Sequence, residues 1–193
     1  MSNEPDLSII AFPSQKAWET WLDEHHATSG GLWLNIAKKG SGIETVSYAE
    51  ALGADLCHGG FAGQKGSFDN EFWLQRFTPC NGRSKWSKVN RDKVTKLIEE
   101  SRMKPAGLQE VERSKADGRW EAAYDSQSIA AVPDDPRRKL EKNETARAFF
   151  ATLDSANRYA ILYQIQDAKR PNTRTWRIGT YVAMLNKRKK LYP

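Results

Sequence analysis

The sequence has few of the side chains on which disulfide and metal chemistry depend. Its 193 residues include two cysteines, Cys57 and Cys80, and three histidines, of which His25 and His26 are neighbours. Two cysteines so far apart do not form the disulfide framework of a small secreted domain. Adjacent residues on a helix point in different directions, so His25 and His26 are not expected to share a metal ion. We therefore predict no metal site.

The motifs that mark the common nucleotide-dependent enzymes are also missing. No G-x-G-x-x-G follows an expected strand, and neither the P-loop pattern G-x-x-x-x-G-K-[ST] nor the nucleophile pattern G-x-S-x-G occurs. The metal-binding patterns H-E-x-x-H and C-x-x-C are missing too. Without these signatures we expect no cofactor, and no motif in the chain prescribes a reaction.

Long hydrophobic runs are lacking as well. No apolar run reaches transmembrane length, and the first residues, Met1-Ser2-Asn3-Glu4-Pro5-Asp6, are acidic where a signal peptide is basic and then apolar. We therefore expect a cytoplasmic protein with no membrane insertion. The formal net charge of +6 favours weak attraction to nucleic acid, acidic surfaces or anionic small molecules, and does not choose among them.

The sequence does contain enough apolar surface for a folded core. Hydrophobic residues make up 39% of the chain, and seven tryptophans are spread along it. A chain of this length can bury a core without disulfides or metals, so a single domain over residues 1–193 is the expectation. We predict an N-terminal α+β lobe at about 1–90 and a helical C-terminal lobe at about 91–190.

The N-terminal part alternates between helical and strand periodicity. Apolar residues recur at helical spacing over 14–26 and at every second position over 32–36. Ser47 and Glu50 form a capping box that opens a second helix, and residues 61–77 have the pattern of a β-hairpin. These elements predict an α+β fold, in which a small antiparallel sheet of one strand and a hairpin packs against helices.

After Pro79 the sequence predicts helices only. Asn90 is expected to cap one helix, and Pro105 to open another that Gly118 ends. Apolar stripes at helical spacing then continue over 133–185. These stripes predict the mostly helical C-terminal lobe.

Residues 76–90 form the densest polar and aromatic segment of the chain. The segment follows an expected strand, so it can direct backbone N–H groups and arginine side chains at an anion. Alternatively, its polar side chains fix the loop by backbone hydrogen bonds while a tryptophan fills the core. Both interpretations stay open at this point. The candidate ligand-binding residues are Gly60, Arg76, Thr78, Arg83, Trp86 and Arg174.

The same segment carries a family resemblance. It contains Leu74-Gln75-Arg76-Phe77-Thr78-Pro79, followed by Ser84-Lys85-Trp86-Ser87-Lys88-Val89-Asn90. With these motifs the sequence resembles the YdeI/OmpD-associated (bacteriocin-protection) family over roughly residues 10–190. The resemblance implies a protective role against cationic antimicrobial stress, and hence a binding protein. Further matching motifs are Arg102-Met103-Lys104-Pro105-Ala106-Gly107-Leu108, Gly118-Arg119-Trp120, Val132-Pro133-Asp134-Asp135 and Arg177-Ile178.

Two departures from the family pattern fall around the hairpin. The family shows Cys-(Phe/Tyr)-Gly-Trp-Ile-Asp-Gly where this chain has Cys57-His58-Gly59-Gly60-Phe61-Ala62-Gly63, and Cys80 replaces an arginine. Glycine in place of tryptophan removes a large side chain, and the space left at Gly60 could hold a ligand. We therefore expect a remodelled pocket next to the hairpin.

Two functions compete for this pocket. The first is a small-molecule or stress-linked binding protein that takes a small organic or anionic ligand, with a protein partner left open. The second is a cofactor-independent enzyme that acts on a small organic molecule by acid/base catalysis. In the enzyme, His58 is the candidate proton-transfer group and Cys80 the candidate nucleophile or polar wall. Arg76 or Arg83 would stabilise a developing negative charge.

A third function is weak nucleic-acid binding. Arg83, Lys85 and Lys88 surround Trp86, which could combine phosphate contacts with base stacking. Because the chain has no recognised nucleic-acid motif, nucleic acid is the least favoured partner.

Overall fold

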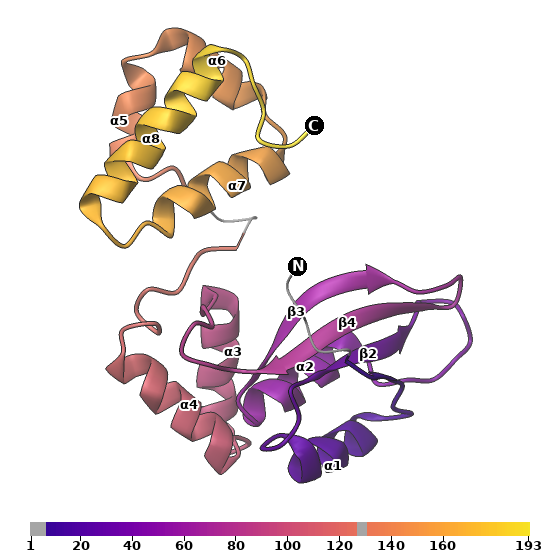
Figure 1. The fold of residues 1–193 in the computed structure, drawn as a ribbon. Coiled ribbons are helices and arrows are strands. Elements are labelled where there is room, and N and C mark those ends of the chain that lie inside the picture. Colours follow the sequence, from indigo (N-terminus) through magenta and orange to yellow (C-terminus); the bar gives the residue numbers. More distant parts are fainter. Residues whose placement is uncertain (1–6, 127–130) are drawn as a thin grey trace. The chain divides into compact units, whose positions relative to one another are not determined.

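A computed structural model describes residues 7–126 and 131–193 of the chain, which divides into two compact units. Unit 1 spans Met1–Ala123 and unit 2 spans Tyr124–Pro193 (Figure 1). Each unit has a hydrophobic core of its own. The sequence placed the change of lobe at about residue 90, whereas the structure places it after Ala123. That the whole chain is a single domain stays a prediction.

The described part of unit 1 contains a four-stranded mixed sheet. Its strands are β1 (Ile9–Ile10), β2 (Leu32–Ala37), β3 (Gly60–Ser67) and β4 (Phe72–Pro79), in the spatial order β1-β2-β4-β3. β1 runs parallel to β2, and the other pairs are antiparallel. The predicted α+β class and the hairpin of β3 and β4 are confirmed. The parallel strand β1 was not predicted, because two residues are too few for strand alternation to show.

The core face of the sheet follows the predicted alternation of β2. Leu32 and Leu34 are buried, and they pair in register with Phe77 and Gln75 of β4. Because side chains alternate along a strand, this register puts Phe77 and Gln75 on the core face and Arg76 on the opposite face.

Gln75 is a buried polar residue with a clear structural role. β3 has an irregularity between Ala62 and Lys65, which leaves carbonyl groups outside the regular ladder. The Gln75 Nε2 atom donates to the carbonyl oxygens of Gly63 at 2.9 Å and Gln64 at 3.0 Å. The side chain therefore satisfies the backbone at the irregularity.

Two capped helices cover the core face of the sheet (Figure 1). In α1 (Gln15–His25), the Ser14 hydroxyl accepts from a backbone N–H group of the first turn. In α2 (Tyr48–Cys57), Ser47 and Glu50 form the predicted capping box, with both reciprocal hydrogen bonds present. Side-chain caps of this kind each stabilise a helix by about 1 kcal/mol.

Two further helices complete unit 1. α3 (Lys88–Glu99) is capped by Ser87, whose Oγ atom accepts from the N–H group of Asn90 at 3.1 Å. The prediction of Asn90 as the cap was therefore wrong: Asn90 lies in the first turn. α4 (Pro105–Ala116) has Pro105 at its start, as predicted, and the chain leaves it through Gly118 at φ +78°. Glycine takes this left-handed conformation without strain.

Over residues 131–193, the regular structure of unit 2 is helical. Its elements are α5 (Asp134–Glu141), α6 (Glu144–Thr152), α7 (Ser155–Gln166) and α8 (Pro171–Asn186), which confirm the predicted C-terminal helices. In neither described range, 7–126 or 131–193, does any helix have the length and apolar character to cross a membrane. The core of unit 2 includes Leu140, Ala146, Phe150, Ile161, Leu162, Ile165, Ile178 and Leu185.

The positive charge of the chain is concentrated in unit 2. Between Tyr124 and Pro193 the sequence has 14 lysines and arginines and 7 aspartates and glutamates, a net charge of +7. Between Met1 and Ala123 it has 16 against 17, a net charge of −1. The excess that motivated the nucleic-acid and anionic-ligand alternatives therefore lies outside the unit that contains the hairpin.

The contact between Gly31 and β4 gives a test of the packing of unit 1. Gly31 has φ +113°, and a Cβ atom there would lie 2.3 Å from the carbonyl oxygen of Phe77. The neighbouring Gly30 has no heavy atom within 4 Å of an added Cβ. We expect Gly31→Ala to lower the free energy of unfolding by about 2 kcal/mol or more. The alanine backbone would be strained at this φ, and its Cβ atom would overlap the carbonyl oxygen of Phe77. Gly30→Ala should change it by less than about 1 kcal/mol.

Urea unfolding of the two variants checks this expectation. Equal stability of Gly31→Ala and Gly30→Ala would contradict the close approach of Gly31 to β4.

Candidate functional site: a pocket with a buried carboxyl group

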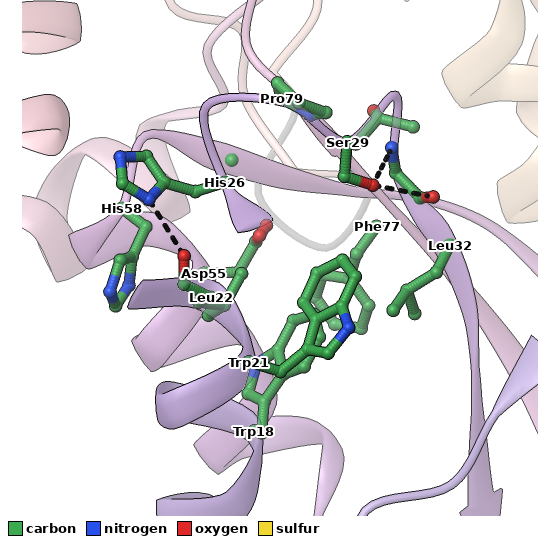
Figure 2. Close-up of a pocket in the computed structure, with 13 residues that line it drawn as sticks. Trp18, Trp21, Leu22, His26, Ser29, Leu32, Asp55, His58, Phe77 and Pro79 are labelled. Atoms are coloured by element: carbon green, nitrogen blue, oxygen red, sulfur yellow. Dashed lines mark hydrogen bonds between the residues drawn. The ribbon is translucent and has the colours of Figure 1, made fainter. Parts of the chain in front are cut away.

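A pocket in unit 1 lies where α1, α2 and the ends of β2, β3 and β4 meet (Figure 2). The cavity volume is small, about 20 Å³, and the pocket opens to solvent. One part of its wall is apolar and the other is polar. The apolar lining consists of Trp18, Trp21, Leu22, Leu32, Phe77 and Pro79, and the remaining lining residues are His26, Ser29, Gly31, Asp55, His58, Gly60 and Thr78.

Stacked aromatic rings make the apolar wall rigid. The rings of Trp18 and Trp21 are stacked with centroids 5.4 Å apart, and Phe77 packs against Trp18 at 5.6 Å. The Trp18 Nε1 atom donates to the carbonyl oxygen of Ala51 at 3.1 Å. A tryptophan that is packed and hydrogen-bonded in this way is fixed before any ligand arrives.

Asp55 is the most unusual group in the pocket. It lies on α2, it is only 4% exposed, and its Oδ2 atom is buried without a hydrogen-bond partner among the described residues. Figure 2 shows its carboxyl group directed toward the space that the labelled side chains enclose. Burial raises the pKa of Asp55 well above its ordinary value, because a charged carboxylate loses its hydration there. Burial therefore favours the neutral acid.

Gly60 makes room for this carboxyl group. A Cβ atom at position 60 would lie 2.2 Å from the Asp55 Oδ1 atom, so any side chain there must displace Asp55. The sequence predicted a void at Gly60. The structure shows that Gly60 lines the pocket and that the carboxyl group of Asp55 occupies the space next to it.

His58 also lines the pocket, and both of its ring nitrogens are engaged. Nδ1 lies 2.7 Å from the carbonyl oxygen of Ala54, and Nε2 lies 2.9 Å from the Asp23 Oδ1 atom. Hydrogen bonds from His58 and Lys104 lower the pKa of Asp23, so its carboxylate is an acceptor. With two acceptors facing it, His58 ties α1 to α2 and has no free nitrogen to take a proton from a substrate.

Cys80 lies one residue beyond β4, and its backbone N–H donates to the carbonyl oxygen of Gly59 at 2.9 Å. Burial raises the pKa of its thiol, and the nearby charge of Glu110 raises it further. A thiol with a raised pKa is a poor nucleophile. No hydrogen bond joins His58 to Cys80 in the described ranges. The predicted catalytic pair thus lacks a base and an activated thiol.

Arg119 fixes the loop that follows β4. Its Nη1 atom donates to the carbonyl oxygens of Asn81 and Ser84, each at 3.2 Å, and to the Glu110 Oε1 atom at 2.9 Å. Both charged side chains are buried, so each depends on the other for stabilisation. Arg119 was not a sequence candidate, because nothing in its local pattern distinguishes a buried arginine from an exposed one.

The loop candidates Trp86, Arg83 and Arg76 do not gather at the pocket. Trp86 is 3% exposed and packs edge-on against Phe61 and Trp120, with centroids 4.7 and 4.8 Å apart. This packing supports the interpretation in which Trp86 fills the core. Arg83 is exposed, and Arg76 is on the sheet face opposite the core. Three predicted residues, His58, Gly60 and Thr78, line the pocket.

Arg174 lies in unit 2 and has a structural partner there. Its guanidinium group makes two hydrogen bonds to the Asp135 carboxylate, at 2.6 and 2.7 Å, and a third to the carbonyl oxygen of Ile165 at 3.0 Å. The hydrogen bonds from Arg174 lower the pKa of Asp135. The pair joins the start of α5 to α8, which accounts for Arg174 without a ligand.

The sequence analysis missed Asp55. The residue belongs to the run Ala51-Leu52-Gly53-Ala54-Asp55-Leu56-Cys57, in which the acid is the single charged residue among small and apolar ones. A lone acid in such a helix is a usable signal, because an ionisable group among core positions is rarely left without a role.

The protein thus consists of two units. An α+β unit contains the small pocket, and a helical unit has a hydrophobic core of its own. Residues 10–110, just over half of the chain, match the family described as a domain of unknown function (DUF8412), and the chain belongs to that family. Residues 130–188 match the family described as Bacteriocin-protection, YdeI or OmpD-Associated, which confirms the predicted resemblance for this part. No curated protein and no solved structure matches the chain.

The two matches divide the chain much as the structure does. The motifs quoted between Leu74 and Asn90 lie within the first match, and the helices of unit 2 lie within the second. The pocket and Asp55 therefore belong to the DUF8412 part.

The raised pKa of Asp55 predicts how stability depends on pH. Above about pH 4 an unfolded chain releases the Asp55 proton, whereas the folded chain keeps it until its higher pKa is reached. The wild type should therefore lose stability relative to Asp55→Asn as the pH rises through this window, by up to about 1.4 kcal/mol per pH unit. Above the folded pKa the difference should level off, with the variant more stable.

Urea unfolding between pH 4 and pH 9 measures the difference, with Asp92→Asn on an exposed part of α3 as the matched control. The control should follow the wild type. A difference between Asp55→Asn and wild type that is constant with pH would contradict the burial of Asp55.

Proposed function

We propose that the chain is a small-molecule binding protein and that its site is the pocket of unit 1. The observation that carries this proposal is the Asp55 carboxyl group, which is buried at the pocket without a partner. A buried polar group without a hydrogen bond costs about 1–3 kcal/mol of stability, so proteins rarely keep one that has no role. Pockets with apolar walls and a few convergent polar groups are the usual sites for small ligands.

The arrangement suggests how a ligand would be held. Its apolar part would lie against Trp18, Trp21 and Phe77, whose positions are already fixed by stacking. Its polar group would reach Asp55 and satisfy the free carboxyl oxygen. The stress-linked part of the proposal is supported by the match of residues 130–188, whose family description names bacteriocin protection.

A second candidate function is acid/base catalysis in the same pocket, with Asp55 as the proton-transfer group. The specific observation in its favour is the raised pKa of Asp55, since general acids work best when their pKa approaches the operating pH. Asp55 replaces His58 and Cys80 in this role, because His58 has no free nitrogen and the Cys80 thiol is held neutral. Steady conversion of a bound ligand that Asp55→Asn abolishes would favour this function.

We also propose that the protein acts in the cytoplasm. Both cysteines are free, and Cys57 is buried and Cys80 half-buried, which suits a reducing compartment.

Native mass spectrometry of protein purified from its own host tests the binding function. Wild type should carry a small molecule, and Gly60→Ala should lose it, because the added Cβ would lie 2.2 Å from the Asp55 Oδ1 atom and push the carboxyl group away. Gly63→Ala is the matched control on the same strand, since its Cβ would make only ordinary contacts, the nearest at 3.7 Å. A ligand that survives in Gly60→Ala, or a wild type without one, would count against the proposal.

A further inference from the structure

We infer that the pocket takes a protonated amine, whose ammonium group pairs with the carboxylate of Asp55. This inference rests on the proposed function, because it names the ligand class of the same site.

The charges around the pocket favour a cation. None of the thirteen residues that line it is a lysine or arginine, and one of them, Asp55, has a carboxyl group. An anionic ligand could not stabilise an ionised Asp55, and the lining has no lysine or arginine to offset the charge of such a ligand. The anionic ligand that the net charge of +6 suggested does not suit this site.

Lys104, a cationic side chain that shares the Asp23 carboxylate with His58, is already paired. Lys104 Nζ lies 3.0 Å from the Asp23 Oδ1 atom, which His58 also contacts at 2.9 Å. These three side chains form a local ion-pair group in which the acid of α1 is satisfied. Asp55 has no such counter-charge among the described residues. An ionised Asp55 would therefore lack a positive partner, which the ligand would supply.

A neutral ligand would not account for an acid at this position. Neutral Asp55 can donate one hydrogen bond to a carbonyl group, but an asparagine would do the same without the penalty of a buried ionisable group. A carboxyl group binds a ligand more strongly than the asparagine amide only when it ionises, because a charge-assisted hydrogen bond is roughly twice as strong as a neutral one. The rings of Trp18, Trp21 and Phe77 line the same pocket, and aromatic faces also attract cations.

Binding of an amine is linked to release of the Asp55 proton. Besides Asp55, the titratable groups at the pocket are His26 at the end of α1 and His58 after α2, and Cys80 follows β4. Burial favours neutral Asp55 and the ammonium group needs it ionised, so affinity should rise with pH up to the point where Asp55 ionises unaided. Loss of any positive charge on His26 would also raise the affinity for the amine as the pH rises. The variant His26→Gln is therefore needed to separate this effect from the ionisation of Asp55.

The test uses the full chain and two matched probes, n-butylammonium and 1-butanol, which have similar shapes and differ in charge. NMR titration follows the indole N–H signals of Trp18 and Trp21, which line the pocket. Wild type should bind n-butylammonium at least about tenfold more tightly than 1-butanol. Asp55→Asn should abolish this preference. Affinity for the amine should rise with pH in wild type and in His26→Gln, and should be flat in Asp55→Asn.

Each other outcome is decisive. If 1-butanol binds wild type as tightly as the amine, or if Asp55→Asn keeps the preference, the amine class is wrong while ligand binding at the pocket stands. If neither probe binds but native mass spectrometry finds a ligand that depends on Gly60, the amine class again fails alone. If neither probe binds and no ligand co-purifies, the amine class and the proposed function both fail.

Discussion

The close packing at the C-terminal end of α2 is the constraint on which the rest of unit 1 depends. The carbonyl oxygen of Cys57 accepts from the backbone N–H of Lys104 at 3.1 Å, and that of Gly59 accepts from Cys80 at 2.9 Å. His58 reaches Asp23 on α1 from the same turn. Three consecutive residues, Cys57, His58 and Gly59, thus join this turn to α1, to the start of α4 and to the end of β4. Because these hydrogen bonds join the turn to several elements, they hold it in one conformation.

Two glycines allow other segments to pack closely against α2. A Cβ atom at Gly107 would lie 2.2 Å from the carbonyl oxygen of Cys57, so α4 can approach α2 only because position 107 is glycine. In the same way, the absence of a side chain at Gly60 leaves room for the Asp55 carboxyl group. The result is an acid held out of water at the wall of a pocket, at a cost in stability that a neutral side chain would avoid. Functional sites often keep such unfavourable groups, because the ligand or the reaction uses them.

The sequence predicts local features well and this site poorly. The alternation over 32–36 and the capping box at Ser47 depend on neighbouring residues, so both appear in the structure as expected. His58 lines the pocket, but its partner Asp23 lies 35 positions away, and no local pattern shows that both ring nitrogens are occupied. Asp55 was missed for the same reason, because its burial is set by tertiary packing that surrounds α2.

The protonation state of Asp55 is the central claim, and its side-chain carboxyl carbon reports it directly. Carbon-13 NMR of the wild type, with the Asp55 signal assigned through Asp55→Asn, gives the pKa of this one group across a pH titration. The account predicts that the carbon keeps the chemical shift of the neutral acid well above pH 4, the range in which ordinary aspartates have already ionised. A titration midpoint near pH 4 would show an exposed, ordinary carboxylate and would contradict the account.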